Sequence, residues 1–241
     1  MNIIIADNYD HLSKKAADVV AGQVQFKPES ALGLPTGSTP MGMYDELVRR
    51  HKEESLSFAR VKTFNLDEYL DIDPENPGSF STYMEENFFN HVDIDPENAY
   101  IPHPSPEDTS EECRRYEEKI KEAGGIDLIV LGVGQNGHIA FLEPAEKLPL
   151  ETTVMKLADQ TRTASQGNFA SRKNVPKRGI TMGLNTILSA ERILLIANGE
   201  SKAAVVEQMI VREVTTKFPV SFLHLHDDVT VILDQEAAKN I

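Results

Sequence analysis

Short apolar segments alternate along this chain with longer segments that have the spacing of amphipathic helices. The apolar segments predict strands at Asn2–Ala6, Ala31–Leu34, Val61–Leu66, Ile126–Leu131, Thr152–Leu157, Ile193–Ala197, Phe222–Leu225 and Val229–Leu233. Helices are predicted at Tyr9–Val24, Pro40–Glu53, Phe80–His91 and Ser201–Val211, and another starts at the capping box of Thr109 and Glu112. This alternation predicts an α/β fold of Rossmann-like type, with a mostly parallel twisted sheet and helices on both faces.

The whole chain, residues 1–241, is predicted to form a single domain. Its length is sufficient to bury a sizeable core. The sequence contains no internal repeat, low-complexity tract or obvious linker. The proline-rich stretch at 101–108 is too short to separate two domains, so we interpret it as a surface connection.

The charge balance limits the classes of partner. The chain has 24 Lys and Arg residues against 38 Asp and Glu residues, a formal net charge of −14. Nucleic acids and anionic membranes require a basic face, so we expect neither as a partner. An anionic substrate would need a locally positive site within this repulsive field. The sequence begins without a signal-peptide pattern, and no apolar run approaches the roughly 20 residues that span a bilayer, so we expect a cytoplasmic protein.

The single cysteine, Cys113, cannot form an internal disulfide. It shares one face of a predicted helix with Tyr116 and Ile120. We therefore interpret it as a buried core residue rather than a redox group.

The segment after the second predicted strand has the composition of an anion-binding turn. Thr36, Gly37, Ser38 and Thr39 follow the strand, and Pro40 then opens a helix. Backbone N–H groups of such a turn, together with the helix dipole, can bind a phosphate. The segment is not a Walker A loop, because no Gly-Lys-Ser/Thr follows. An ordinary turn without a ligand is the alternative.

Two consecutive carboxylates, Asp67 and Glu68, stand where another predicted strand ends. A carboxylate suits removal of a proton next to a carbonyl when burial raises its pKa towards neutrality. The alternative is a helix N-cap or a surface carboxylate pair.

Residues 131–144, LGVGQNGHIAFLEP, follow a predicted buried strand. Their glycines at 132, 134 and 137 match the dinucleotide fingerprint literally. That fingerprint requires a crossover helix after the third glycine, and Pro144 follows too soon for one. We therefore reject NAD binding.

The same stretch places Asn136, His138 and Glu143 within eight residues at a strand tip, where ligands bind in open α/β sheets. A carboxylate and an amide beside an imidazole can fix its tautomer and tune its basicity. This combination indicates proton-transfer chemistry. A core histidine is the alternative.

Lys202 lies in the first turn of a predicted helix, where a cation opposes the helix dipole by roughly 0.3–1 kcal/mol. An anion between the two would offset this cost, and a lysine that extends into solvent is the alternative. His224 and His226 alternate on one face of a predicted strand. No third ligand accompanies them, so no metal site is predicted.

Four stretches occur in an order that matches one known family. They are LGLPTGSTP (32–40), FNLDEY (64–69), GVGQNGHIAFLEP (132–144) and, less specifically, GITMGLNTIL (179–188) with NGESKA (198–203). The chain resembles the glucosamine/galactosamine-6-phosphate isomerase (deaminase) family over nearly its whole length, from Asn2 to Asp234.

The resemblance implies conversion of a 2-amino-2-deoxyhexose 6-phosphate to a ketohexose 6-phosphate and ammonia. It implies that His138 opens the pyranose ring, oriented by Glu143 and by residue 136. It implies that Asp67 moves the proton from C2 to C1. The substrate phosphate would lie on Thr36–Thr39 and on Lys202. These steps need neither a cofactor nor a metal.

Several positions depart from the family pattern. Asn136 stands where many members carry Asp, so His138 should be less basic here, and Leu142 replaces a common Asn. The segment 161–173 lacks the Ala-Asn-x-Arg pattern whose Arg binds the substrate phosphate in the family. The candidates to replace that residue are Arg162, Arg172 and Lys173.

Two further departures bear on regulation and on the preferred substrate. Glu146 stands near a Ser with which allosteric members hold an activator phosphate, so we expect no activation by an N-acetylhexosamine phosphate. The segment 213–228 looks closer to galactosamine-6-phosphate isomerases, which favours the galacto epimer, with glucosamine 6-phosphate close behind.

Two other functions compete with this interpretation. A 6-phosphogluconolactonase-like hydrolase needs no base at a C2–H, and Tyr69 and Glu143 count against it, since lactonases typically carry Arg at the position of Tyr69. A non-catalytic phosphosugar sensor would usually be fused to a DNA-binding module, and none is visible. The expected partner is thus a small phosphosugar, and a homo-oligomer is compatible with the sequence.

Overall fold

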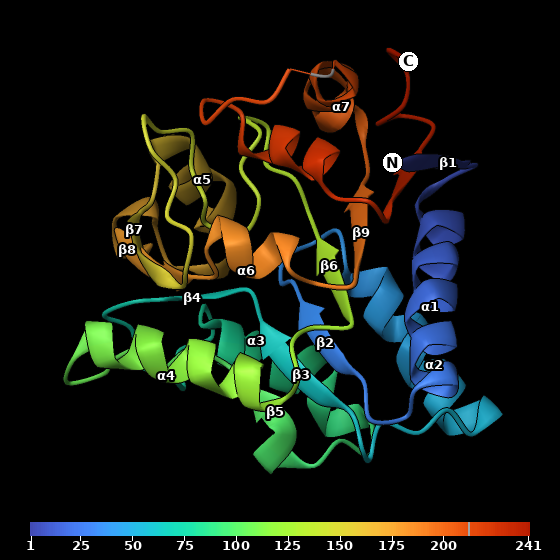
Figure 1. Cartoon of the computed structure of the whole chain (residues 1–241), viewed down its shortest axis with the longest axis horizontal. Helices are drawn as coiled ribbons and strands as arrows, with labels where there is room; N and C mark the ends of the chain where they lie inside the picture. The colour runs from blue at the N-terminus through green and yellow to red at the C-terminus, as the bar shows by residue number, and fades with distance from the viewer. Residues whose placement is uncertain (212) are drawn as a thin grey trace.

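A seven-stranded sheet runs through the molecule, and each of its six strand pairings is parallel (Figure 1). In spatial order the strands are β1 (Asn2–Ala6), β10 (Val229–Asp234), β9 (Arg192–Ala197), β6 (Leu128–Leu131), β2 (Ala31–Leu34), β3 (Lys62–Asn65) and β5 (Ala99–Tyr100). This computed structural model, which describes residues 1–211 and 213–241, confirms the predicted α/β class.

Seven α-helices are assigned within the described residues. They are α1 (Tyr9–Phe26), α2 (Met41–Glu54), α3 (Phe80–Asn87), α4 (Thr109–Glu122), α5 (Asp159–Ala164), α6 (Leu184–Leu188) and α7 (Ala203–Ile210). Among these residues, no helix has the length and apolar character that a membrane crossing requires.

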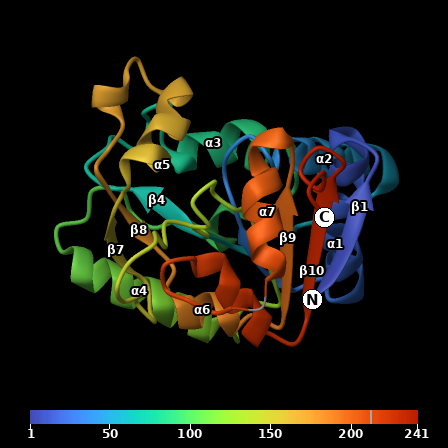
Figure 2. The same cartoon turned by 90° about the horizontal axis from the view of Figure 1, so that it is seen from above.

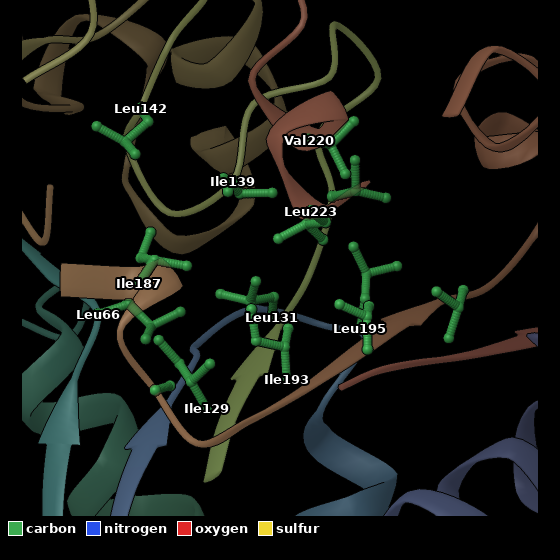
Figure 3. Packing of buried hydrophobic residues seen from close by; sticks show 14 of the residues in the cluster. Leu66, Ile129, Leu131, Ile139, Leu142, Ile187, Ile193, Leu195, Val220 and Leu223 are labelled. Atoms are coloured by element: carbon green, nitrogen blue, oxygen red, sulfur yellow. The ribbon is translucent and has the colours of Figure 1, made fainter. Parts of the chain in front are cut away.

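Successive residues of the central strands face opposite layers of the core. Leu128 and Val130 of β6 belong to the cluster formed with α1 and α2. Ile129 and Leu131 belong to a second cluster on the other face, together with residues of α4, α6 and α7 (Figure 3). This period of two explains why the strands of a doubly covered parallel sheet are apolar at every position.

A second, antiparallel sheet lies on the opposite side of the molecule from β1 and β10 (Figure 2). Its strands, in order, are β4 (Asp67–Tyr69), β8 (Arg178–Thr181) and β7 (Thr153–Lys156). The sequence predicted a single strand that ends at Asp67, but the chain changes sheets at Leu66. The Leu66 N–H donates to Leu34 of the main sheet, and its carbonyl accepts from Met182 beside β8.

The strand predicted at Phe222–Leu225 is wrong, because Pro219–Leu225 forms a 3-10 helix that starts at a proline. His224 and His226 therefore do not share a strand face. Nε2 of His224 lies 2.7 Å from the carbonyl oxygen of Met209, and Nε2 of His226 lies 2.8 Å from that of Ala190. Each histidine thus connects the segment after α7 to the backbone of another part of the chain.

Three predicted helix boundaries also needed correction. The side chain of Asp108, not that of Thr109, caps α4 by accepting from two backbone N–H groups. Helix α3 ends at Asn87 because Phe88 leaves helical geometry and packs between Tyr44 and Phe58. Helix α7 begins at Ala203, so Lys202 lies immediately before the helix and not in its first turn.

Four neighbouring strands, β9, β6, β2 and β3, end at the same edge of the main sheet. Each is followed by one of the segments that the sequence singled out for its chemistry. The order of the chain reverses between β2 and β6, and such a switch point is where open α/β sheets bind ligands.

Candidate active site

A cavity of about 790 Å³ opens at these strand ends. Its size is within the range of small-molecule sites. Its walls come from the turn after β2, from Asp67 and Tyr69 of β4, from residues 132–138 after β6, from α5 and the segment that follows it, and from Lys202.

Tyrosine hydroxyls contact three carbonyl groups of the turn Thr36–Thr39 and the carbonyl group that precedes it. Tyr44 donates to the carbonyl of Pro35, Tyr83 donates to that of Gly37, and Tyr9 lies within hydrogen-bond distance of those of Ser38 and Thr39. No hydrogen bond from the amides of Thr36–Thr39 is found in the part of the chain that the structure describes. Gly37 has a φ of 105°, which glycine adopts without strain.

Helix α2 begins directly after this turn. Its N-cap residue, Pro40, makes no side-chain cap, and the hydroxyl of Tyr9 accepts from the N–H of Gly42 in the first turn of the helix over 2.9 Å. Unpaired amides and the N-terminal end of a helix together favour an anion. The sequence predicted the turn as an anion site, but it carried no signal for the tyrosines, whose hydroxyls reach the turn only in the folded chain.

Lys202 supplies a cation to the same cavity. Its Nζ donates to the carbonyl oxygen of Val133 over 2.8 Å, which holds the ammonium group beside the segment after β6. Burial lowers the pKa of Lys202. The turn Thr36–Thr39 is connected to the segment before Lys202, because the hydroxyl of Thr39 donates to Asn198 over 2.7 Å.

Asp67 lines the cavity and is only 6% exposed. Burial, together with the charge of Glu68, raises the pKa of its carboxyl group well above the usual range. A carboxylate in such an environment is a stronger base than one in water.

Glu68 points away from the cavity and has a structural role. Its carboxylate accepts from the backbone N–H groups of Tyr69, Phe80 and Ser81 at 2.7–3.0 Å. Two of these donors belong to the first turn of α3, so Glu68 caps that helix. Burial raises its pKa to about 7, although the three donors oppose this shift. The N-cap alternative for the pair is thus confirmed for Glu68 only.

His138, Asn136 and Glu143 form a connected chain of hydrogen bonds. The side-chain oxygen of Asn136 accepts from the backbone N–H of His138 at 3.2 Å and lies 2.7 Å from its Nδ1. The side-chain nitrogen of Asn136 donates to Glu143 over 2.8 Å. Both contacts require the same orientation of the amide, so Nδ1 carries the proton and Nε2 is the basic nitrogen of the neutral ring.

Burial lowers the pKa of His138, an effect that the nearby Glu143 opposes and Lys202 reinforces. The neutral form of the imidazole is therefore favoured, and this form can accept a proton. Glu143 is 5% exposed and lies behind Asn136 rather than among the cavity-lining residues.

The glycines of the rejected dinucleotide fingerprint have other roles. A Cβ on Gly134 would lie 2.1 Å from Cε1 of His138, so this glycine makes room for the imidazole. Gly137 has a φ of 84°, and the ring of Phe218 packs against it. After His138, a turn from Ile139 to Leu142, with Ala140 at a φ of 48°, brings Glu143 back beneath the imidazole.

The segment after β7 forms the remaining wall. Asp159, Gln160 and Thr161 of α5 line the cavity, and so does Arg172, which pairs with Asp159 over 2.9 Å. Arg162 instead directs its guanidinium group at the backbone carbonyls of Val175 and Pro176. Of the three cations that the sequence offered for a missing arginine, Arg172 is the one found among the lining residues.

An aromatic cluster supports this wall. Tyr69 and Phe80 line the cavity, and Phe141 packs against both at 5.3 and 5.7 Å between ring centres. Phe169 closes on Tyr69 at 5.6 Å and fills the space beside Gly78. This cluster carried no separate signal in the sequence, since aromatic residues of an α/β domain are usually part of the core.

The structure thus brings Thr36–Thr39, Asp67, Asn136, His138 and Lys202 to one cavity, with Glu143 directly behind it. Four residues of this site were not predicted from the sequence. They are Thr161 and the three tyrosines whose hydroxyls contact the turn, Tyr9, Tyr44 and Tyr83. Among the described residues, no group of three or more His, Cys, Asp or Glu side chains is arranged to hold a metal ion.

Comparison with known proteins gives consistent results over the whole chain. A family model described as glucosamine-6-phosphate isomerases/6-phosphogluconolactonase matches residues 6–232. Glucosamine-6-phosphate deaminase from Thermoanaerobacter pseudethanolicus is 48% identical over 241 residues, covering all of this chain and 95% of that protein. The protein of the same name from Halothermothrix orenii is 49% identical over 238 residues, covering 99% of each chain.

Solved structures separate two levels of similarity. A monomeric glucosamine-6-phosphate deaminase superimposes with a TM-score of 0.98 at 43% identity, covering all of both chains. The 6-phosphogluconolactonase from Thermotoga maritima gives a TM-score of 0.76 at 20% identity, covering 97% of this chain and 98% of that one. The second similarity concerns the fold alone.

Proposed function

The chain belongs to the family of glucosamine-6-phosphate isomerases and 6-phosphogluconolactonases, and on that premise we propose that it deaminates glucosamine 6-phosphate. The products are fructose 6-phosphate and ammonia. The observation that carries this proposal is that one cavity is lined by a basic imidazole nitrogen, a buried carboxylate and an anion-binding turn.

The phosphate of the substrate binds at the turn Thr36–Thr39. Its backbone amides are unused among the described hydrogen bonds, and Lys202 supplies a positive charge nearby. We assign Arg172 as the second cation, which would exchange its contact with Asp159 for the phosphate. Lys202 and Arg172 thus bring positive charge to the cavity of a chain whose net charge is −14.

His138 opens the pyranose ring. Its Nε2 takes the proton from the C1 hydroxyl, the C1–O5 bond breaks, and the ring oxygen receives a proton. Nδ1–H remains hydrogen-bonded to Asn136, which keeps the ring in this tautomer through the step. Asn136 is neutral, so the negative charge that stabilises a protonated imidazole comes from Glu143, 3.7 Å from Nδ1.

Asp67 then moves a proton between neighbouring carbons. It removes the proton from C2 of the open aldose and forms an enolamine, and it returns the proton at C1 to leave an imine at C2. Water adds to this imine, and ammonia leaves as the C2 carbonyl forms. Every step is a proton transfer, an addition or an elimination, so no oxidant or reductant is consumed.

The lactonase reaction is the second candidate, since the family and the fold include it. A lactonase needs a base for water but no carboxylate at a C2–H. Tyr69 stands where we expect Arg in that group, and the aromatic cluster around it leaves the cavity wall uncharged there.

A coupled ammonia assay tests the proposal. Purified protein is offered glucosamine 6-phosphate, galactosamine 6-phosphate and 6-phosphogluconolactone side by side. We expect ammonia from glucosamine 6-phosphate at the highest kcat/KM. Faster release from galactosamine 6-phosphate would support the galacto preference that the segment 213–228 suggested. Hydrolysis of the lactone without ammonia release from either amino sugar would overturn the proposal.

A further inference from the structure

The hydroxyl of Thr161 lies between Glu143 and His138. Thr161 is 6% exposed, and its Oγ1 donates to Oε1 of Glu143. The same oxygen atom lies 3.4 Å from Nδ1 of His138. Because its proton is directed at the carboxylate, Thr161 can only accept at the imidazole side.

Glu143 is held at both of its oxygens. Oε1 accepts from Thr161 and from the backbone N–H of Ala158 at 3.1 Å, and Oε2 accepts from Asn136 at 2.8 Å. A carboxylate fixed in this way cannot rotate without breaking several buried hydrogen bonds. Its position keeps the amide nitrogen of Asn136 facing it, and therefore keeps the amide oxygen facing His138.

Three acceptors consequently surround Nδ1 of His138. The side-chain oxygen of Asn136 is 2.7 Å away, Oγ1 of Thr161 is 3.4 Å away, and Oε2 of Glu143 is 3.7 Å away. This environment is compatible with a proton on Nδ1 and disfavours a bare lone pair there.

We propose that Thr161 is a positioning residue, which holds Glu143 and Asn136 so that His138 keeps its Nδ1–H tautomer and presents a basic Nε2. The kinetic part of this inference rests on the proposed function, because it assigns Nε2 to ring opening. The tautomer itself is a property of the protein without substrate.

Thr161→Val tests the proposal, since valine keeps the branched shape and removes the hydroxyl. We expect kcat for glucosamine 6-phosphate to fall about 10-fold, because general base catalysis depends on the position of the base. KM should change less than about 2-fold, because the hydroxyl is directed at Glu143 rather than at the bound sugar. Thr161→Ser, which restores a hydroxyl, should recover most of the lost kcat.

Thr186→Val is the matched control. Thr186 is 7% exposed, and its hydroxyl donates over 2.6 Å to Glu117, which also accepts twice from Thr152. This variant removes a comparable threonine–glutamate hydrogen bond from a half-buried glutamate outside the cavity. It should keep kcat within about 2-fold of the unmodified protein, since distant sites act independently. An equal loss in both threonine variants would show that Thr161 acts through stability alone and would overturn the proposal.

Nitrogen-15 NMR of labelled histidine measures the tautomer directly, with the His138 signals assigned from their absence in His138→Gln. In the unmodified protein we expect a protonated Nδ1 and a bare Nε2, and in Thr161→Val a mixture of the two tautomers. A dominant Nε2–H form in the unmodified protein, or an unchanged tautomer in a well-folded Thr161→Val, would refute the inference. These spectra need no turnover, so they remain decisive even if no ammonia is released from either sugar.

Discussion

The side-chain oxygen of Asn136 lies 2.7 Å from Nδ1 of His138, while the nitrogen of the same amide donates to Glu143. A neutral amide thus occupies the position next to the imidazole that we propose as a catalytic base, and the carboxylate of Glu143 lies 3.7 Å from the same nitrogen.

Asn136→Asp should make His138 more basic. A carboxylate at hydrogen-bond distance from Nδ1 stabilises the imidazolium form and opposes the burial that lowers the pKa of His138 in the unmodified protein. A base with a raised pKa is protonated up to a higher pH. We therefore expect the acid limb of the kcat/KM profile to move up by about one pH unit. An acid limb at the original pH would show that His138 does not control it.

Gly134→Ala should displace the imidazole. The added Cβ would lie within 2.5 Å of three atoms of the His138 ring, so the ring must leave its place beside Asn136. We expect kcat to fall about 10²-fold because the base is misplaced. Gly22→Ala is the control, because a Cβ there meets no atom within 4 Å. Full activity of Gly134→Ala would contradict the assigned position of the ring.

Asp67→Asn should abolish the chemistry and stabilise the protein. Without a carboxylate no proton is removed from C2, so neither ammonia release nor hydrogen exchange at C2 in deuterated water should occur. Burial raises the pKa of Asp67, and the ionised form therefore costs free energy of folding once the pH exceeds the pKa of the unfolded chain.

The gain in Tm from Asp67→Asn should accordingly be largest above the raised pKa of the folded protein. It should shrink as the pH falls through that value towards the unfolded pKa, where the aspartate is protonated in both states. Thermal unfolding at several pH values measures this gain in Tm. About 2–4 °C is expected for each kcal/mol by which the free energy of unfolding increases. Exchange at C2 at the original rate would exclude Asp67 as the base.

Arg172→Gln should weaken substrate binding through the phosphate. Arg172 lines the cavity, whereas its neighbour Lys173 is not among the lining residues. We expect KM for glucosamine 6-phosphate to rise about 10-fold in Arg172→Gln, in line with the loss of one charge-assisted hydrogen bond. Lys173→Gln should leave KM close to its original value. Equal effects of the two substitutions would indicate general electrostatics rather than direct contact.

N-acetylglucosamine 6-phosphate should not activate the protein. Glu146 is exposed and pairs with Lys217, so a carboxylate stands near the position at which the sequence resemblance places a phosphate-holding serine. A second phosphate would be repelled there. Rate curves recorded with and without this compound should superimpose, and a leftward shift in the presence of the compound would contradict the expectation.

Sequence periodicity predicted most of the main sheet because its central strands β2, β6 and β9 are buried and almost continuously apolar. The prediction failed where local composition was ambiguous. β8 is short and follows a polar stretch, so no strand was predicted at Arg178–Thr181. Phe222–Leu225 has strand composition, but Pro219 and the hydrogen bond from Val220 to Gly137 select a 3-10 helix.

The candidate site divides in the same way. Asp67, His138, Glu143 and the turn Thr36–Thr39 were identified because their residue types are informative and each follows a predicted strand. The sequence could not predict that Asp67 lines the cavity while Glu68 caps α3, since this depends on where the first turn of α3 lies in space. Thr161, Tyr9, Tyr44 and Tyr83 could not be recognised in the sequence, because the role of a hydroxyl group depends on the partner that it reaches in the folded chain.

The sequence by itself determined the class of fold, the strand ends that carry polar residues and the kind of chemistry those residues can perform. These features follow from local periodicity and from side-chain type, which act over a few neighbouring residues. Only the tertiary structure decided which of these residues meet, which carbonyl groups of the turn are hydrogen-bonded by tyrosines, and which nitrogen of His138 is the basic one. Those properties depend on hydrogen bonds between segments that are far apart in the chain and are brought together by burial of the core.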